Sequence, residues 1–142
     1  MRTAPGASGR GPRVFPAHPG QAAVVITAFT GLLYLSEAVD TVLGGTLDGA
    51  GIQPREIDGL DGVLWAPLLH AGWQHLVANT VPVLVLGFLT LAGGIAQFLV
   101  VTAVVWVVGG VGIWLIGAPF THLGASVLVF GWMAFLLVRG FY

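Results

Sequence analysis

Four long apolar segments limit what this chain can fold into. They cover about residues 22–43, 67–91, 95–116 and 123–142, and each is close to the roughly 17 to 25 residues that an α-helix needs to cross a bilayer. Charged residues make up 8% of the chain, whereas a soluble domain carries about 25%. The sequence therefore predicts an all-α fold, a polytopic transmembrane helical bundle embedded in a lipid bilayer. We expect Pro82 to interrupt the second helix.

The polar residues at the two ends of the chain predict its orientation. Residues 1–21 are rich in Gly, Pro and Ala, which is typical of a disordered tail. A secretory signal peptide is the competing interpretation, but the apolar run that follows is too long for one and no cleavage site closes it. Three arginines precede the first helix and Arg139 ends the fourth, so both termini are predicted to be cytoplasmic. The polar connection of about residues 44–65 then lies outside, together with the starts of the second and fourth helices.

Several kinds of site are excluded or disfavoured by the residue types present. Cysteine is absent, which excludes disulfides, iron–sulfur clusters and thiolate zinc sites, and the net charge of −1 provides no footprint for nucleic acid. Imidazole is a common metal ligand, so His70, His75 and His122 are possible ligands. No carboxylate accompanies them at a known spacing, and His-Glu-x-x-His does not occur. We predict neither a metal nor a cofactor, and expect His70 and His122 to make interfacial hydrogen bonds.

Glu37 and Asp40 lie three residues apart, on one face near the outer end of the first helix. One interpretation is a proton relay, because ionisable groups inside a membrane are costly and usually functional. The other is that both carboxylates point outward into the polar interface, where this cost is small. We favour the second interpretation.

His75 and Asn79 are polar residues near the start of the second apolar segment. Positions i and i+4 lie on one face of a helix, so the two side chains are expected to point the same way. Each can donate a hydrogen bond, and a pair of donors held in a dry site stabilises a developing oxyanion. The alternative is interhelical hydrogen bonding, which the spacing taken alone favours.

Ser126 follows Gly124 and Ala125 at the start of the fourth apolar segment, and is a possible nucleophile. A residue at a helix start also has unpaired backbone N–H groups beside it, which can serve as oxyanion donors. The segment does not match the Gly-x-Ser-x-Gly elbow of soluble hydrolases, because Leu128 stands where the second glycine would be. By the predicted topology, Ser126 and His75 lie near the same, outer surface of the membrane.

Together these residues resemble the rhomboid family of intramembrane serine proteases, over about residues 51–142. The stretch from Ala66 to Asn79 resembles the second helix of that family with its His-x-x-x-Asn signature. The stretch from His122 to Ser126 resembles the Gly-x-Ser-Gly nucleophile motif of its fourth helix.

The resemblance implies a six-helix core, of which residues 22–142 would hold four helices, and an activity without a cofactor. Ser126 would attack the scissile carbonyl, and the Ser126 amide, His75 and Asn79 would form the oxyanion hole. The substrates would be transmembrane segments of other membrane proteins, cut near the outer face of a bacterial plasma membrane.

The chain departs from the family pattern in two places. The family's general base is a histidine on the sixth helix, and none of His18, His70, His75 and His122 can be assigned that role. Val127 replaces the last glycine of the nucleophile motif, on a stripe of otherwise small residues that we expect to meet the helix carrying the base. A serine without a base is a poor nucleophile. We therefore expect a fragment or an inactive copy as written, or alternatively a non-catalytic rhomboid-like protein that binds transmembrane segments.

Overall fold

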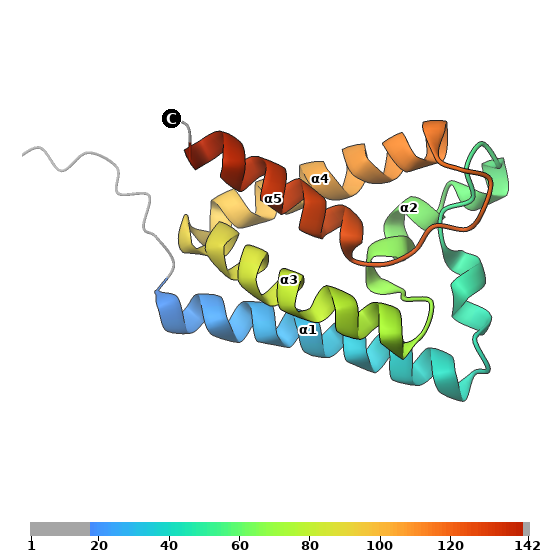
Figure 1. The fold of residues 1–142 in the computed structure, drawn as a ribbon, viewed down its shortest axis with the longest axis horizontal. Coiled ribbons are helices and arrows are strands. Elements are labelled where there is room, and N and C mark those ends of the chain that lie inside the picture. The colour runs from blue at the N-terminus through green and yellow to red at the C-terminus, as the bar shows by residue number, and fades with distance from the viewer. Residues whose placement is uncertain (1–17, 141–142) are drawn as a thin grey trace, which may run out of the picture.

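The computed structural model describes residues 18–140, and the regular structure within that range is helical (Figure 1). The predicted all-α class is confirmed. The five α-helices are α1 (Pro19–Val42), α2 (Gly62–Trp65), α3 (Trp73–Ala92), α4 (Ile95–Ile116) and α5 (Ser126–Gly140). Three short 3-10 helices, η1 (Thr46–Ala50), η2 (Ile57–Gly59) and η3 (Ala66–Leu68), occupy the connection between α1 and α3.

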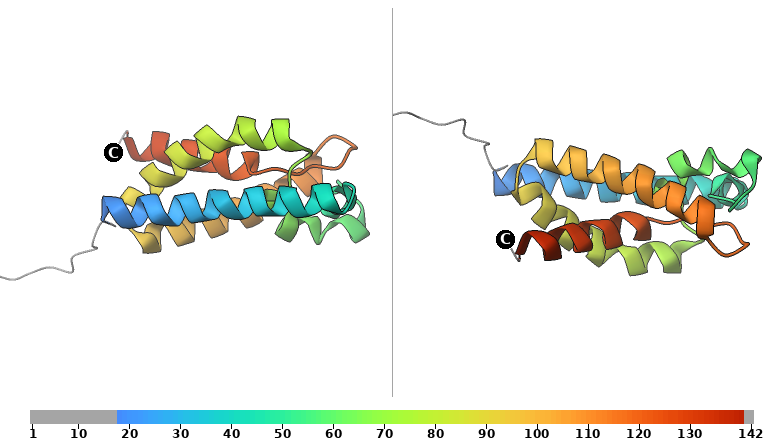
Figure 2. Two further views of the ribbon diagram at one scale, coloured as in Figure 1. Left: turned by 90° about the horizontal axis from the view of Figure 1, so that it is seen from below. Right: turned by 90° about the horizontal axis from the view of Figure 1, so that it is seen from above.

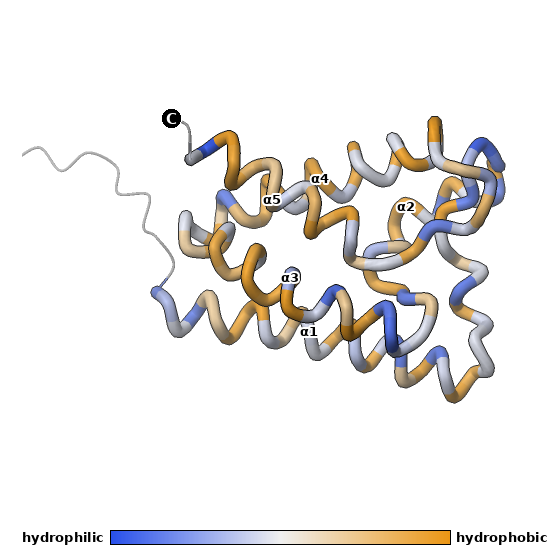
Figure 3. Tube along the Cα trace, viewed as in Figure 1, coloured by the Kyte–Doolittle hydropathy of each residue, from blue (hydrophilic) through white to orange (hydrophobic). Residues whose placement is uncertain are grey.

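The four longer helices form one bundle in which α3 contacts both α1 and α5, and α5 also packs on α4 (Figures 1 and 2). The start of α1 and the end of α5 lie at one end of this bundle. The α1–α3 connection and the α4–α5 loop lie at the other, as the alternating helix directions require. Polar residues gather in these connections, whereas the helices are mostly apolar (Figure 3).

Three helices, α1, α3 and α4, are long and apolar enough to cross a membrane. The fourth expected span is a shorter apolar helix: α5 begins at Ser126 rather than near residue 123, and 15 of its residues are described. Half of the residues of α4 are exposed, and only Phe98 and Gly110 of that helix are buried. An apolar helix with so little buried surface is suited to contact lipid.

The helices differ from the predicted ranges at their starts. The second long helix does not begin near Pro67, since Leu69 is extended and Gly72 adopts a positive φ of 94° before α3 begins at Trp73. Pro82 lies within α3 without interrupting it, which membrane helices tolerate. The first helix begins at Pro19, since proline suits the first turn of a helix. Of the predicted disordered tail, residues 1–17 lie outside the described range.

Trp132 of α5 is the centre of the core, with no exposed surface. Its ring lies 5.6 Å from that of Phe98 on α4 and 6.4 Å from that of Phe29 on α1. Its Nε1–H donates to the Thr102 hydroxyl of α4 at 3.0 Å. One aromatic side chain of α5 therefore joins the two outer helices of the bundle.

The expectation that Glu37 and Asp40 point outward is wrong. Only 3% of Glu37 and 6% of Asp40 is exposed, because η1 folds back over the end of α1. The Asp40 Oδ1 accepts a hydrogen bond from the Leu47 N–H at 2.7 Å, so this carboxylate anchors η1. Glu37 Oε2 has no hydrogen-bond partner among the described residues.

The α1–α3 connection is folded and holds the loop that leads into α5. Ile52 forms a two-hydrogen-bond antiparallel bridge with His122, with both N···O distances 2.8 Å. Arg55 donates its backbone N–H to Trp114 O at 2.9 Å and its guanidinium to Gly117 O at 2.9 Å. Since the last carbonyls of a helix lack intrahelical donors, Arg55 caps the end of α4. These contacts fix both ends of the loop before Ser126.

Candidate active site

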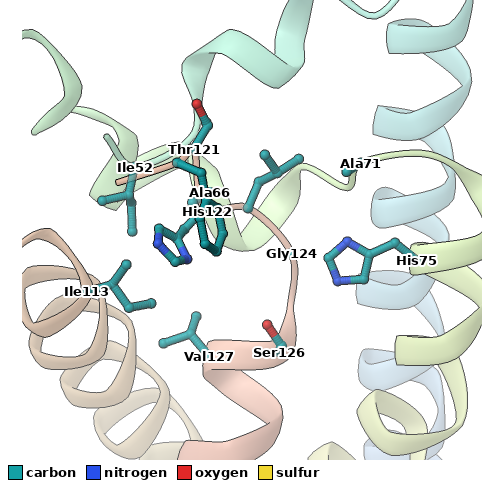
Figure 4. A pocket seen from close by; sticks show the side chains of 12 residues that line it. Ile52, Ala66, Ala71, His75, Ile113, Thr121, His122, Gly124, Ser126 and Val127 are labelled. Atoms are coloured by element: carbon teal, nitrogen blue, oxygen red, sulfur yellow. The ribbon is translucent and has the colours of Figure 1, made fainter. Parts of the chain in front are cut away.

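A cavity of about 360 Å³ opens where the start of α3, the start of α5 and the α1–α3 connection meet (Figure 4). His75 enters it from α3 and Ser126 from α5, with the Gly124 loop between them. The rest of the wall is mainly apolar. It is formed by Ile52, Ala66, Ala71, Ile113, Phe120, Thr121, His122, Leu123, Gly124 and Val127. The structure thus brings together the predicted nucleophile and one of the two predicted oxyanion donors.

Ser126 is the first residue of α5, and the loop before it sets its position. Gly124 has a φ of 121°, which L side chains rarely adopt, and its N–H donates to Ala66 O at 2.8 Å. Within residues 18–140, the backbone N–H groups of Ser126, Val127 and Leu128 have no hydrogen-bond acceptor. The serine hydroxyl therefore lies beside a set of free N–H donors at the positive end of a helix dipole.

His75 lies on the first turn of α3 and packs directly on Gly124. A Cβ atom at position 124 would lie 2.6 Å from Cε1 and 2.9 Å from Nε2 of the His75 ring. Position 124 must therefore be glycine for two reasons, its backbone conformation and this contact. Because the contact holds the imidazole against the loop that carries Ser126, a ring N–H can be directed at the cavity.

Asn79 does not line the cavity. Its side chain is 7% exposed, and its Nδ2 donates to the backbone carbonyl of His75 at 2.9 Å, within the same helix. The helical spacing places both side chains on the same side of α3, as predicted, but Asn79 lies one turn farther along the helix than His75. Of these two residues, only His75 lines the cavity.

His70 is a site residue that the sequence analysis missed. It is 2% exposed, and its Nε2 accepts a hydrogen bond from the Ala125 N–H at 3.2 Å. Its ring lies 5.3 Å from that of His75, edge to face. On a continuous helix, residues five apart would lie on different faces, but His70 precedes α3, so this geometry does not apply to it. The flanking Pro67 and Gly72 were the available signal, because both residue types mark a break in helical periodicity.

His122 lies in the wall of the same cavity, in the α4–α5 loop. Its Nε2 is 3.0 Å from Ala118 O, and its ring stacks on Phe120 with centroids 4.2 Å apart. Both His70 and His122 therefore make a hydrogen bond, but that of His70 is buried within the protein. In the described part of the chain, no three residues of the His, Cys, Asp and Glu types are arranged to hold a metal ion.

Part of the small-residue stripe on α5, at Val127 and Gly131, faces α4. A Cβ atom at Gly109 of α4 would lie 2.5 Å from Val127 Cγ2, and one at Gly131 would collide with Val105 of α4. Each helix therefore inserts a valine opposite a glycine of the other. The bulk of Val127 fills the α4–α5 interface.

Comparison with known proteins places these features in a family. Residues 60–142 match the model of the Rhomboid domain. An uncharacterized protein of Mycobacterium tuberculosis (strain ATCC 25618 / H37Rv) is 53% identical over 123 residues, which cover 82% of this chain and 51% of that protein. An uncharacterized protein of Mycobacterium leprae (strain TN) is 50% identical over 125 residues, which cover 84% of this chain and 50% of that protein. The chain spans about half the length of these curated relatives. No solved structure gives a significant match.

Proposed function

This chain belongs to the rhomboid family. From that premise we propose that it provides the nucleophile and the oxyanion donors of an intramembrane serine endopeptidase, which cleaves transmembrane segments of other proteins. The observation that carries the proposal is the shared cavity of Ser126 and His75, beside the free N–H groups of the first turn of α5. The termini are proposed to be cytoplasmic, with the cavity near the outer face of the plasma membrane.

In the proposed chemistry, Ser126 Oγ attacks the carbonyl carbon of the scissile peptide bond. The carbonyl oxygen becomes an oxyanion that accepts hydrogen bonds from the Ser126 N–H and from a ring N–H of His75. Such preorganised donors each contribute about 10²–10³ in rate. Asn79 joins them only if its amide leaves the His75 carbonyl, which it contacts at 2.9 Å in this structure.

The attack also needs a base to take the serine proton. Among residues 18–140, no side chain hydrogen-bonds to the Ser126 hydroxyl, and the His122 Nε2–H donates to Ala118 O instead. The proposal therefore assigns this chain the nucleophile and the oxyanion donors. It assigns the base to a histidine on a further helix that packs at the open side of the cavity, as the family resemblance implies.

A second candidate is a non-catalytic rhomboid-like protein that binds transmembrane segments. It is favoured by the Ser126 hydroxyl, which has no hydrogen bond to a base among the described residues, and by the intrahelical bond of Asn79. The apolar wall of the cavity would then accept a side chain of a bound helix without any chemistry.

A fluorophosphonate probe for activated serines separates the two candidates. The full chain is reconstituted in lipid nanodiscs and incubated with the probe, together with Ser126→Ala and the matched control Ser36→Ala on α1. Labelling that Ser126→Ala abolishes and Ser36→Ala preserves supports the endopeptidase. Because the proposal places the base outside residues 18–140, the three proteins are also tested with imidazole added as an external base. Absence of labelling in all three proteins under both conditions contradicts catalysis by Ser126 and leaves the binding function.

A further inference from the structure

His70 lies against the proposed site but has no part in the proposed chemistry. It belongs to the extended segment between η3 and α3, and only 2% of it is exposed. Its one hydrogen bond joins Nε2 to the N–H of Ala125, the residue before Ser126, at 3.2 Å. Its Nδ1 is buried without a hydrogen-bond partner among the described residues. The His70 ring therefore contacts the backbone of the residue immediately before Ser126.

The bond to Ala125 defines the state of the ring. Since Nε2 accepts a proton from a backbone N–H, the ring must be neutral and must carry its own proton on Nδ1. Burial, together with the nearby charge of His75, lowers the pKa of His70 from 6.5 to about 4. The ring is therefore kept in the form that can accept the Ala125 hydrogen bond at neutral pH.

Two consecutive peptide groups before Ser126 are held by the same segment. The Gly124 N–H donates to Ala66 O at 2.8 Å, and the Ala125 N–H donates to His70 at 3.2 Å. The next three N–H groups, those of Ser126, Val127 and Leu128, have no acceptor within residues 18–140. The boundary between bound and free N–H groups therefore falls at the nucleophile, and His70 makes the last bond before it.

His70 also supports the oxyanion donor from behind. The two rings meet edge to face, with centroids 5.3 Å apart. One loop contacts both rings, since Ala125 bonds to His70 and Gly124 packs on His75. Displacing the ring of His70 would thus disturb Ser126 and His75 together.

We propose that His70 is a positioning residue that fixes the Ala125 peptide, and through it directs the Ser126 hydroxyl and the free N–H groups of α5 into the cavity. The role in catalysis rests on the proposed function of Ser126, whereas the anchoring of Ala125 does not. The experiment below therefore measures the anchoring without any reaction and the reactivity separately.

The first measurement is NMR of the full chain in detergent micelles, with ¹⁵N-labelled histidine and backbone amides. We expect His70 to be an Nδ1–H tautomer with an unprotonated Nε2, and the Ala125 amide shift to follow the titration of His70, near pH 4. His75 is the titratable group whose charge acts on His70, so the titration is repeated in His75→Gln to isolate the effect of burial. An Nε2–H tautomer overturns the proposal, and so does an Ala125 amide shift that does not change as His70 titrates.

The second measurement is hydrogen exchange at Ala125 in variants of His70. In His70→Phe, which keeps the ring but has no acceptor, we expect exchange about tenfold faster than in the wild type, as loss of one hydrogen bond implies. His70→Gln offers an amide oxygen as acceptor and should restore most of the protection. Thr102→Val is the matched control, because it removes the Trp132 hydrogen bond from the far part of α5 and leaves Ala125 untouched.

The third measurement is the rate at which the fluorophosphonate probe labels Ser126 in the same variants. Slow labelling in His70→Phe that His70→Gln rescues, with the wild-type rate in Thr102→Val, supports the positioning role. Equal rates in His70→Phe and the wild type contradict it. If no protein is labelled even with imidazole added as an external base, the catalytic proposal fails for this chain, and the tautomer and exchange measurements still decide whether His70 anchors Ala125. If His70→Phe does not fold, the wild-type titration and His70→Gln decide.

Discussion

Gly124 and His75 are in contact in the cavity wall, so closely that a Cβ atom on Gly124 would lie 2.6 Å from His75 Cε1. The glycine also has a φ of 121°, and both constraints act on the loop that ends at Ser126. The nucleophile and the oxyanion donor are therefore positioned by one shared contact. This relationship makes the site sensitive to changes that leave both polar side chains in place.

Gly124→Ala is expected to destabilise the protein and to displace the His75 ring. Gly72→Ala is the matched control, because Gly72 also has a positive φ, of 94°, but no atom lies within 4 Å of its Cβ position. Backbone strain of about 1–3 kcal/mol is common to both changes, and only Gly124→Ala adds the collision with His75. Thermal unfolding in detergent should show the larger loss for Gly124→Ala. A loss no greater than that of Gly72→Ala would contradict the contact.

Val127 and Gly109 should be energetically coupled, because the valine occupies the space that a side chain at position 109 would need. Gly109→Ala is expected to destabilise the wild type and to cost less in a Val127→Ala background. A double-mutant cycle on unfolding should give a coupling of about 0.5–3 kcal/mol. Additive effects would show that the two residues do not meet. Val127→Gly, which restores the family motif, should lower stability rather than raise it.

His75 and Asn79 should differ in their effect on the reactivity of Ser126. His75→Ala removes a donor from the cavity, so we expect probe labelling to slow by about 10²–10³. Asn79→Ala removes a side chain whose amide is bonded to the His75 carbonyl, and should slow labelling by less than about tenfold. Equal losses for the two variants would mean that Asn79 turns into the cavity during the reaction.

The stability of the fold should depend on the neutral form of His70. Its pKa is lowered from 6.5 to about 4, so its contribution is fully present above pH 6.5 and is lost as the pH falls toward 4. The lost contribution is at most about 3 kcal/mol, from the shift in pKa. Thermal unfolding from pH 7 to 4 should therefore show a steeper decline for the wild type than for His70→Gln, which does not titrate. Parallel declines would show that other groups control the acid sensitivity.

Much of the fold could be predicted because lipid imposes a simple rule on sequence. A segment that crosses a bilayer must be apolar over its length and helical throughout, since its backbone groups find no other partners there. The ranges of α1, α3 and α4 follow from that rule to within a few residues, apart from the start of α3. The rule does not apply to the polar connection of residues 44–65, so its short helices, its bridge to His122 and the Arg55 cap were not predicted.

The sequence by itself determined the class of the protein, its family and the side chains available for chemistry, because hydropathy and short motifs are properties of consecutive residues. Only the tertiary structure decided which of those side chains meet. His75 and Ser126 share a cavity because Gly124 lets two helices approach, and Asn79 is turned back into its own helix. His70 is part of the site because it lies before α3, whose N-cap residue Gly72 follows an extended segment. In that segment the His70 ring reaches the Ala125 N–H. Such contacts join residues about fifty positions apart, and depend on packing that no local pattern records.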